Sequence, residues 1–170
     1  MKEILSYYCH YNLWANAKIA LFFSDKSEDL LNAPIENSFP SIHKTVLHIL
    51  SAEKSWLARL SQNPNNNKQV VDDFPSTQAL FVALLHNSEQ LIQFVDQQEE
   101  VFLNQALAYN SWDGTAWEMS PKLMIQHCTN HSTYHRGQLI TLARQLGMKK
   151  DVPSTDLLYF SREHPSGLHS

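Results

Sequence analysis

Four long stretches of the chain have the pattern of apolar and polar positions that is typical of helices. They cover residues 2–23, 41–60, 77–98 and 121–146. In the second stretch, apolar side chains recur three and four positions apart, which predicts an amphipathic helix with one buried face. Boundary residues support the third and fourth stretches: Ser76 and Ser120 are suitable N-caps, and Gly147 is a frequent helix stop. Pro121 also suits the first position of a helix.

Residues 101–119 interrupt this helical pattern. Asp113-Gly114 is a strong turn signal, and aromatic residues alternate with polar ones around it, at Tyr109, Trp112 and Trp117. Alternation with a period of two predicts strands. We therefore expect a short hairpin or irregular segment before the fourth helix.

The C-terminal part of the chain predicts one further short helix, over residues 156–160. Residues 161–170, which include His164 and His169, are expected to form a mobile tail. The chain has 170 residues, of which 43% are hydrophobic, so it is long enough to bury one core. Since no repeat or linker divides it, we predict a single all-α domain over residues 1–170 with the architecture of a four-helix bundle.

Composition excludes several classes of protein. The net charge is −4 and no run of basic residues occurs, so we expect no nucleic-acid partner. The longest apolar run has seven residues (79–85), far short of the ~20 needed to cross a bilayer. The N-terminus lacks the pattern of a signal peptide, and two cysteines cannot build a disulfide framework. These features favour a protein of the reducing cytoplasm.

Histidine spacing is the main clue to chemistry. The chain has nine histidines, and His127, His131 and His135 are four positions apart within the fourth predicted helix. Each step of four turns the helix by about 400°, so all three lie on one side, and that side is apolar. Two imidazoles at i and i+4 are close enough to bind one metal ion. The alternative is that each is a buried core histidine with a hydrogen-bonded neighbour.

A third metal ligand would have to come from another helix. The candidates are His10, His43, His48 and His86. His43 and His48 are about 140° apart around a helix, so they cannot both face one site. His48 has small neighbours on its face but lies off the centre of the apolar stripe, and spacing leaves the choice open.

Other chemical motifs are absent from the sequence. It contains no Glu-x-x-His pair, no His-Glu-x-x-His motif and no Cys-x-x-Cys pair. It also lacks a glycine-rich phosphate loop and a Gly-x-Ser-x-Gly elbow. Di-iron, zinc-protease, nucleotide and serine-hydrolase chemistry therefore have no support.

Several segments resemble a known family. Residues 127–138, His-Cys-Thr-Asn-His-Ser-Thr-Tyr-His-Arg-Gly-Gln, are similar to the signature of the DinB family of metalloenzyme-like proteins. Residues 11–16, 41–57 and 155–159 resemble other segments of that family. The resemblance implies an up-down-down-up four-helix bundle, commonly a homodimer, with a mononuclear metal site. Carried over by position, the ligands would be His48, His131 and His135, while His127 would lie beside them or in the core.

A three-histidine site would leave a divalent ion at least one open coordination position, which is typical of catalytic sites. Zinc and nickel are the expected ions, and a coordinated water or thiol would be acidified. The resemblance implies a metal-dependent enzyme, either a hydrolase or a transferase acting on a low-molecular-weight thiol or other small substrate. One alternative is a non-catalytic metal-binding or stress-response protein. Another is an interaction module whose histidines serve only packing.

Further residues have weaker predicted roles. Glu53 could orient a ligand histidine or be a solvated acid, and Arg136 could pair with a carboxylate at a tertiary or dimer interface. Gly137 would allow two helices to approach closely. Three aromatic residues, Trp14, Trp56 and Tyr134, are candidates for a pocket wall or for the core, and no role is assigned to Asn12 and Asn16.

Overall fold

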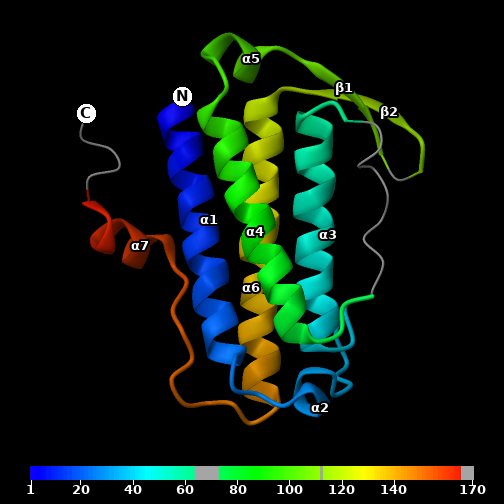
Figure 1. Ribbon diagram of the computed structural model, residues 1–170, viewed down its shortest axis with the longest axis vertical. Helices are drawn as coiled ribbons and strands as arrows, with labels where there is room; N and C mark the ends of the chain where they lie inside the picture. The colour runs from blue at the N-terminus through cyan, green and yellow to red at the C-terminus, as the bar shows by residue number, and fades with distance from the viewer. Residues whose placement is uncertain (64–72, 112, 166–170) are drawn as a thin grey trace.

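The computed structural model describes residues 1–63, 73–111 and 113–165 and contains four long helices (Figure 1). These are α1 (Lys2–Phe23), α3 (Ile42–Leu60), α4 (Thr77–Asp96) and α6 (Pro121–Gln145). α1 and α6 run in one direction, and α3 and α4 run in the other. α1 and α3 each pack against both α4 and α6. The predicted all-α class and four-helix bundle are confirmed, in the up-down-down-up arrangement.

The predicted helix ends are close to the observed ones because local capping chemistry sets them. The side chain of Ser41 accepts a hydrogen bond from the backbone of Lys44, and Ser76 does the same for Ala79. Ser120 is the N-cap residue of α6, but its side chain makes no cap hydrogen bond. Gly147, just beyond α6, has a φ of +87°, a left-handed conformation that glycine adopts without strain.

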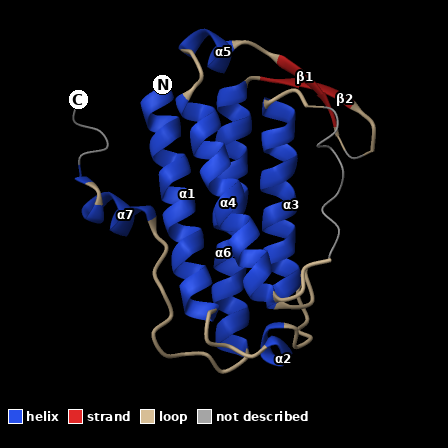
Figure 2. Ribbon diagram, viewed as in Figure 1, coloured by secondary structure: helices blue, strands red, loops and turns tan. Residues whose placement is uncertain are grey.

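Short elements lie at both ends of the bundle, and α7 (Leu157–Glu163) lies along the side of α1 (Figure 2). The elements at the ends are α2 (Glu28–Leu31), α5 (Glu100–Asn104), β1 (Leu107–Asn110) and β2 (Ala116–Met119). β1 and β2 pair antiparallel, with Tyr109 opposite Trp117, so the predicted hairpin is confirmed. The helical turn α5, before the hairpin, was not predicted.

The C-terminal helix is longer than the sequence pattern predicts. α7 continues to Glu163 and thus includes the first residues of the expected tail. His164 stacks on Phe160 with 4.4 Å between ring centroids. Trp112, His169 and the rest of 166–170 lie outside the described residues. No helix in the described ranges combines the length and hydropathy needed to cross a bilayer.

The core contains two large apolar clusters with a polar layer between them, and a smaller third cluster of Tyr11, Ala15 and Phe160. Along α1, Cys9 belongs to one cluster and Ile19 to the other, and Asn12 and Asn16 are buried between them. The other three long helices contribute buried polar residues at the same level of the bundle, namely Glu53, Ser88, Ser132 and Arg136. The centre of the bundle therefore contains one carboxylate and one guanidinium group.

Hydrogen bonds satisfy both oxygens of the Glu53 carboxylate. Asn12 and Asn16 donate to Oε1 through their Nδ2 atoms, over 2.7 and 3.1 Å. Ser132 donates to Oε1 and Ser88 to Oε2, each over 2.8 Å. Because the four donors come from α1, α4 and α6, this one carboxylate ties α3 to all three other long helices.

Arg136 completes the network from the opposite side. Its Nη1 donates to the Oδ1 atoms of Asn12 and Asn16, over 2.6 and 2.9 Å, and its Nη2 donates to Thr133 over 2.7 Å. The two asparagine amides therefore link the buried guanidinium to the Glu53 carboxylate. Each amide donates through its nitrogen and accepts through its oxygen. These contacts account for the two asparagines of α1, to which the sequence pattern assigned no role.

The polar layer predicts a large stability effect at Glu53. In Glu53→Gln the side chain keeps its size but loses its charge, so Arg136 is buried without a counter-charge. Leaving a buried charge without its compensating charge costs about 3–5 kcal/mol. We expect this loss in the free energy of unfolding, measured by urea denaturation.

Glu89→Gln is the matched control, since Glu89 is exposed on α4. Its effect should lie within about 0.5 kcal/mol. Equal stability of the two variants would contradict the assigned role of the network.

Candidate metal centre

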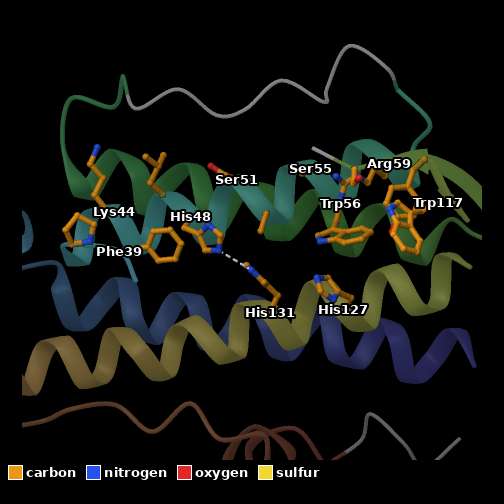
Figure 3. A pocket seen from close by; sticks show the side chains of 15 residues that line it. Phe39, Lys44, His48, Ser51, Ser55, Trp56, Arg59, Trp117, His127 and His131 are labelled. Carbon is orange, nitrogen blue, oxygen red and sulfur yellow. Dashed lines mark hydrogen bonds between the residues drawn. The ribbon is translucent and has the colours of Figure 1, made fainter. Parts of the chain in front are cut away.

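Three imidazoles converge between α3 and α6. Nε2 of His48 lies 3.1 Å from Nε2 of both His131 and His135, and the last two atoms are 3.2 Å apart. His131 and His135 lie on consecutive turns of α6. Figure 3 shows His48 of α3 facing His131. The structure thus resolves the choice that helical spacing left open and brings together the three residues implied by the resemblance.

The donor set fits a small divalent cation. With Zn–N distances of 2.0–2.1 Å, the ligand atoms of a tetrahedral site lie about 3.3 Å apart, close to the separations of the three Nε2 atoms. These three histidines form a group that could hold a metal ion, and within the described ranges no fourth His, Cys, Asp or Glu joins them. A bound ion would therefore retain room for another ligand.

Two neighbours orient the imidazole rings. Nδ1 of His135 lies 2.7 Å from Oε1 of Gln138, so Nδ1 carries the proton and donates it to the amide oxygen. Nε2 of His135 then presents its lone pair to the site. Phe39 stacks on His48, with ring centroids 4.1 Å apart and an interplanar angle of 23°. Neither contact was predicted from the sequence, although Gln138 belongs to the segment that resembles the family signature.

Burial keeps the three imidazoles uncharged near neutral pH. Burial, together with a smaller effect of neighbouring histidines, lowers the pKa of His48 and of His131 to about 4. Burial also lowers the pKa of His135, against the opposing effect of the hydrogen bond that its Nδ1 donates to Gln138. Neutral imidazole is the protonation state that binds metals, so these rings need not lose a proton first.

The remaining candidates for a third ligand lie elsewhere. His10 and His86 are exposed, and His86 is near Glu89. His43 is buried, with Nδ1 2.9 Å from the hydroxyl of Thr77. His43 is thus a core histidine with a polar neighbour, which is the alternative that we considered for a single histidine on an apolar face.

Glu53 does not orient a ligand histidine, and it is not a solvated acid. Its carboxylate is buried in the polar layer, where it accepts hydrogen bonds from Asn and Ser side chains. Arg136 does not pair directly with a carboxylate, because Asn12 and Asn16 lie between it and Glu53. An acidic or basic side chain on a helix predicts that polar groups surround it. Spacing along that helix does not show which residues of the other three helices supply those groups.

A cavity of about 780 Å³ opens beside the three-histidine group. Its middle is formed by His48 and His131, with the small side chains of Ser51, Ala52 and Ser55 leaving space on α3. Phe39 lies at one end, and the hairpin closes the other. The predicted room beside His48 is confirmed.

His127 lines this cavity and is not part of the core. Its ring centroid lies 4.8 Å from that of Trp56 and 5.8 Å from that of His131. Burial, with a smaller contribution from Arg59, lowers its pKa. His127 is therefore a neutral group one helical turn from the candidate metal centre.

Only one of the three aromatic residues proposed for a pocket wall lines this cavity. Trp56 does, whereas Trp14 donates a hydrogen bond to Glu163 and Tyr134 is exposed on α6. The close approach predicted at Gly137 is wrong, because an added Cβ there would meet nothing within 4 Å.

Both cysteines are free and buried. Burial raises the pKa of the Cys9 and Cys128 thiols, so neither is a ready nucleophile.

The sequence also matches a known family over almost its whole length. The model of the DinB family matches residues 1–166. The chain belongs to the DinB family. This DinB family protein is 25% identical over 147 residues to Protein DinB of Bacillus subtilis (strain 168), and the alignment covers 81% of this chain and 83% of that relative. A crystal structure of a DinB-like protein from Bacillus subtilis is similar with a TM-score of 0.68, at 16% identity, covering 88% of this chain and 97% of that one.

Gln138 provides a test of the ring-orienting contact. Gln138→Leu removes the acceptor for the Nδ1 proton of His135, and loss of such a partner weakens metal affinity about 10–100-fold. We expect that change in the zinc dissociation constant, measured by competition with a chromophoric chelator. Gln126→Leu is the control, because Gln126 is exposed on the same helix. Equal zinc affinity in the two variants would rule out the assigned role of Gln138.

Proposed function

We propose that this DinB family protein binds one divalent metal ion through His48, His131 and His135 and is a metal-dependent enzyme. The observation that carries the proposal is the convergence of three Nε2 atoms beside an open cavity. Structural metal sites are usually closed by a fourth protein ligand. Since no fourth candidate ligand joins the group within the described ranges, catalysis is favoured over a purely structural role.

Imidazole donors suit zinc and nickel, which are the ions we propose. The chemistry that such an ion supplies is Lewis-acid activation of a water or a thiol. We therefore infer a hydrolase or a transferase of low-molecular-weight thiols. The homodimer implied by the family and the cytoplasmic location stay predictions.

Residues of the chain itself can prepare the reaction. Gln138 holds the proton on Nδ1 of His135, which keeps Nε2 free for coordination. His127 is neutral and faces the cavity, so its unprotonated ring nitrogen can accept a proton from a water or thiol bound nearby. The rings of Phe39 and Trp56 supply apolar wall on both sides of His48.

Metal content is the first test. Protein purified without an affinity tag should contain about one divalent ion per chain, and His131→Ala should lose it, because two imidazoles bind more weakly than three. His86→Ala, altered at an exposed histidine of α4, should retain the ion. Elemental analysis of the three samples measures this difference.

Thermal unfolding gives an independent reading of the same site. Metal at about 100 times its dissociation constant stabilises by ~2.7 kcal/mol, which corresponds to a rise in melting temperature of about 5–10 °C. Equal metal content in wild type and His131→Ala, or a melting temperature that a chelator leaves unchanged, would contradict the proposal.

Catalysis should follow metal occupancy. Rates of thiol conjugation and of ester or amide hydrolysis should fall at least about tenfold after chelation and return when zinc or nickel is restored. His86→Ala should behave like wild type in the same assays. A reaction whose rate is the same before and after chelation would count against the enzyme proposal and leave a binding role.

A further inference from the structure

The hairpin end of the cavity differs in character from the histidine end. It is lined by Trp56 and Arg59 of α3, Tyr109 of β1, Trp117 of β2 and His127 of α6. Figure 3 shows Trp56, Arg59, Trp117 and His127 gathered at one side of the cavity, with His48 and His131 in the middle. We call these five residues the aromatic end. It combines flat apolar surfaces with one permanent cation.

Arg59 lacks an anionic partner among the residues that the structure describes. Its guanidinium carbon lies 4.6 Å from the ring centroid of Trp56 and 5.0 Å from that of Tyr109. Across the described ranges its guanidinium has no ion pair or hydrogen bond with a protein acceptor, and its Nε, like that of Arg136, is buried without a partner. Partial burial lowers its pKa. Arg136, the other arginine that lies against an aromatic ring, shares three hydrogen bonds with side chains.

An unpaired cation at a cavity wall favours an anionic ligand. Burying a charge without a partner is unfavourable, so a carboxylate that entered the cavity would be stabilised by this guanidinium. Arginine also matches a carboxylate geometrically, since two parallel N–H groups can bind its two oxygens. The cation therefore specifies the charge of the ligand.

The aromatic side chains specify its shape. Trp117 is 56% exposed although it lines the cavity, and its cross-strand neighbour Tyr109 packs edge-on against Trp56 with centroids 5.7 Å apart. Flat rings at a cavity wall gain most from a planar apolar ligand that covers them. An exposed tryptophan in this position contributes little to the core.

We propose that the aromatic end binds an aromatic carboxylic acid, with Arg59 on the carboxylate and Trp56 and Trp117 against the ring. His127 lies between these residues and His131, so the other end of such a ligand points toward the three histidines. This inference names the substrate class of the proposed enzyme and rests on that proposal for the reaction. Binding itself requires only the aromatic end.

The test compares an acid with its uncharged analogue. Phenylacetate and phenylacetamide have the same shape, and their binding to metal-free protein is measured by quenching of tryptophan fluorescence. Phenylacetate should bind at least about tenfold more tightly, because only it forms charge-assisted hydrogen bonds with Arg59. The metal is removed so that a carboxylate cannot bind to it directly.

Arg59→Gln provides the matching change in the protein. It should weaken phenylacetate binding about tenfold or more and leave phenylacetamide binding unchanged. Arg144→Gln is the control, since Arg144 is exposed in the last turn of α6. The comparison of the two probes in wild type needs no variant, so the test holds even if Arg59→Gln fails to fold.

Three results would overturn the inference: no binding of phenylacetate at millimolar concentration, equal binding of acid and amide in wild type, or equal binding of the acid to Arg59→Gln and wild type. The metal content of the protein as purified, before the metal is removed, separates this outcome from failure of the proposed function. Selective binding of phenylacetate by a protein that contains no metal as purified would support the inference and defeat the enzyme proposal. Metal binding by a protein that does not distinguish phenylacetate from phenylacetamide would support the enzyme proposal and overturn the inference.

Discussion

The buried network of Glu53 and Arg136 is the interaction on which the arrangement of the bundle depends. Glu53 accepts hydrogen bonds from α1, α4 and α6, so the rotation of each helix about its axis is fixed by one carboxylate. On α6 the network uses Ser132 and Arg136, each one position after a histidine of the candidate metal centre. Since one position turns a helix by about 100°, directing these two residues to the centre of the bundle directs His131 and His135 toward α3.

The candidate metal centre thus lies at the boundary between a packed core and an open cavity. Burial lowers the pKa of the imidazoles and keeps them available as ligands, while the cavity leaves one side of the group accessible. The network behind the histidines ties the four helices together, and the hairpin in front places Tyr109 and Trp117 beside Trp56 and Arg59 of α3. Bundle and hairpin therefore have separate tasks: the bundle positions the metal ligands, and the hairpin completes the surface that would select a substrate.

Much of the fold follows from local sequence signals, because caps such as Ser41 and Ser76 act within one helical turn. The i, i+4 histidine pair was visible for the same reason. Helical spacing could not choose between His48 and His43, because the choice depends on how α3 is rotated against α6. Glu53 was misinterpreted because its partners lie on three other helices. Arg59 was missed as well, because its significance depends on contacts with the hairpin that no spacing along α3 reveals.

The most direct measurement is a crystal structure of the zinc-loaded protein with anomalous diffraction data collected at the zinc edge. The account predicts one strong anomalous peak about 2.0–2.1 Å from Nε2 of each of His48, His131 and His135. A peak bound by other residues, or no peak where these three side chains meet, would contradict it.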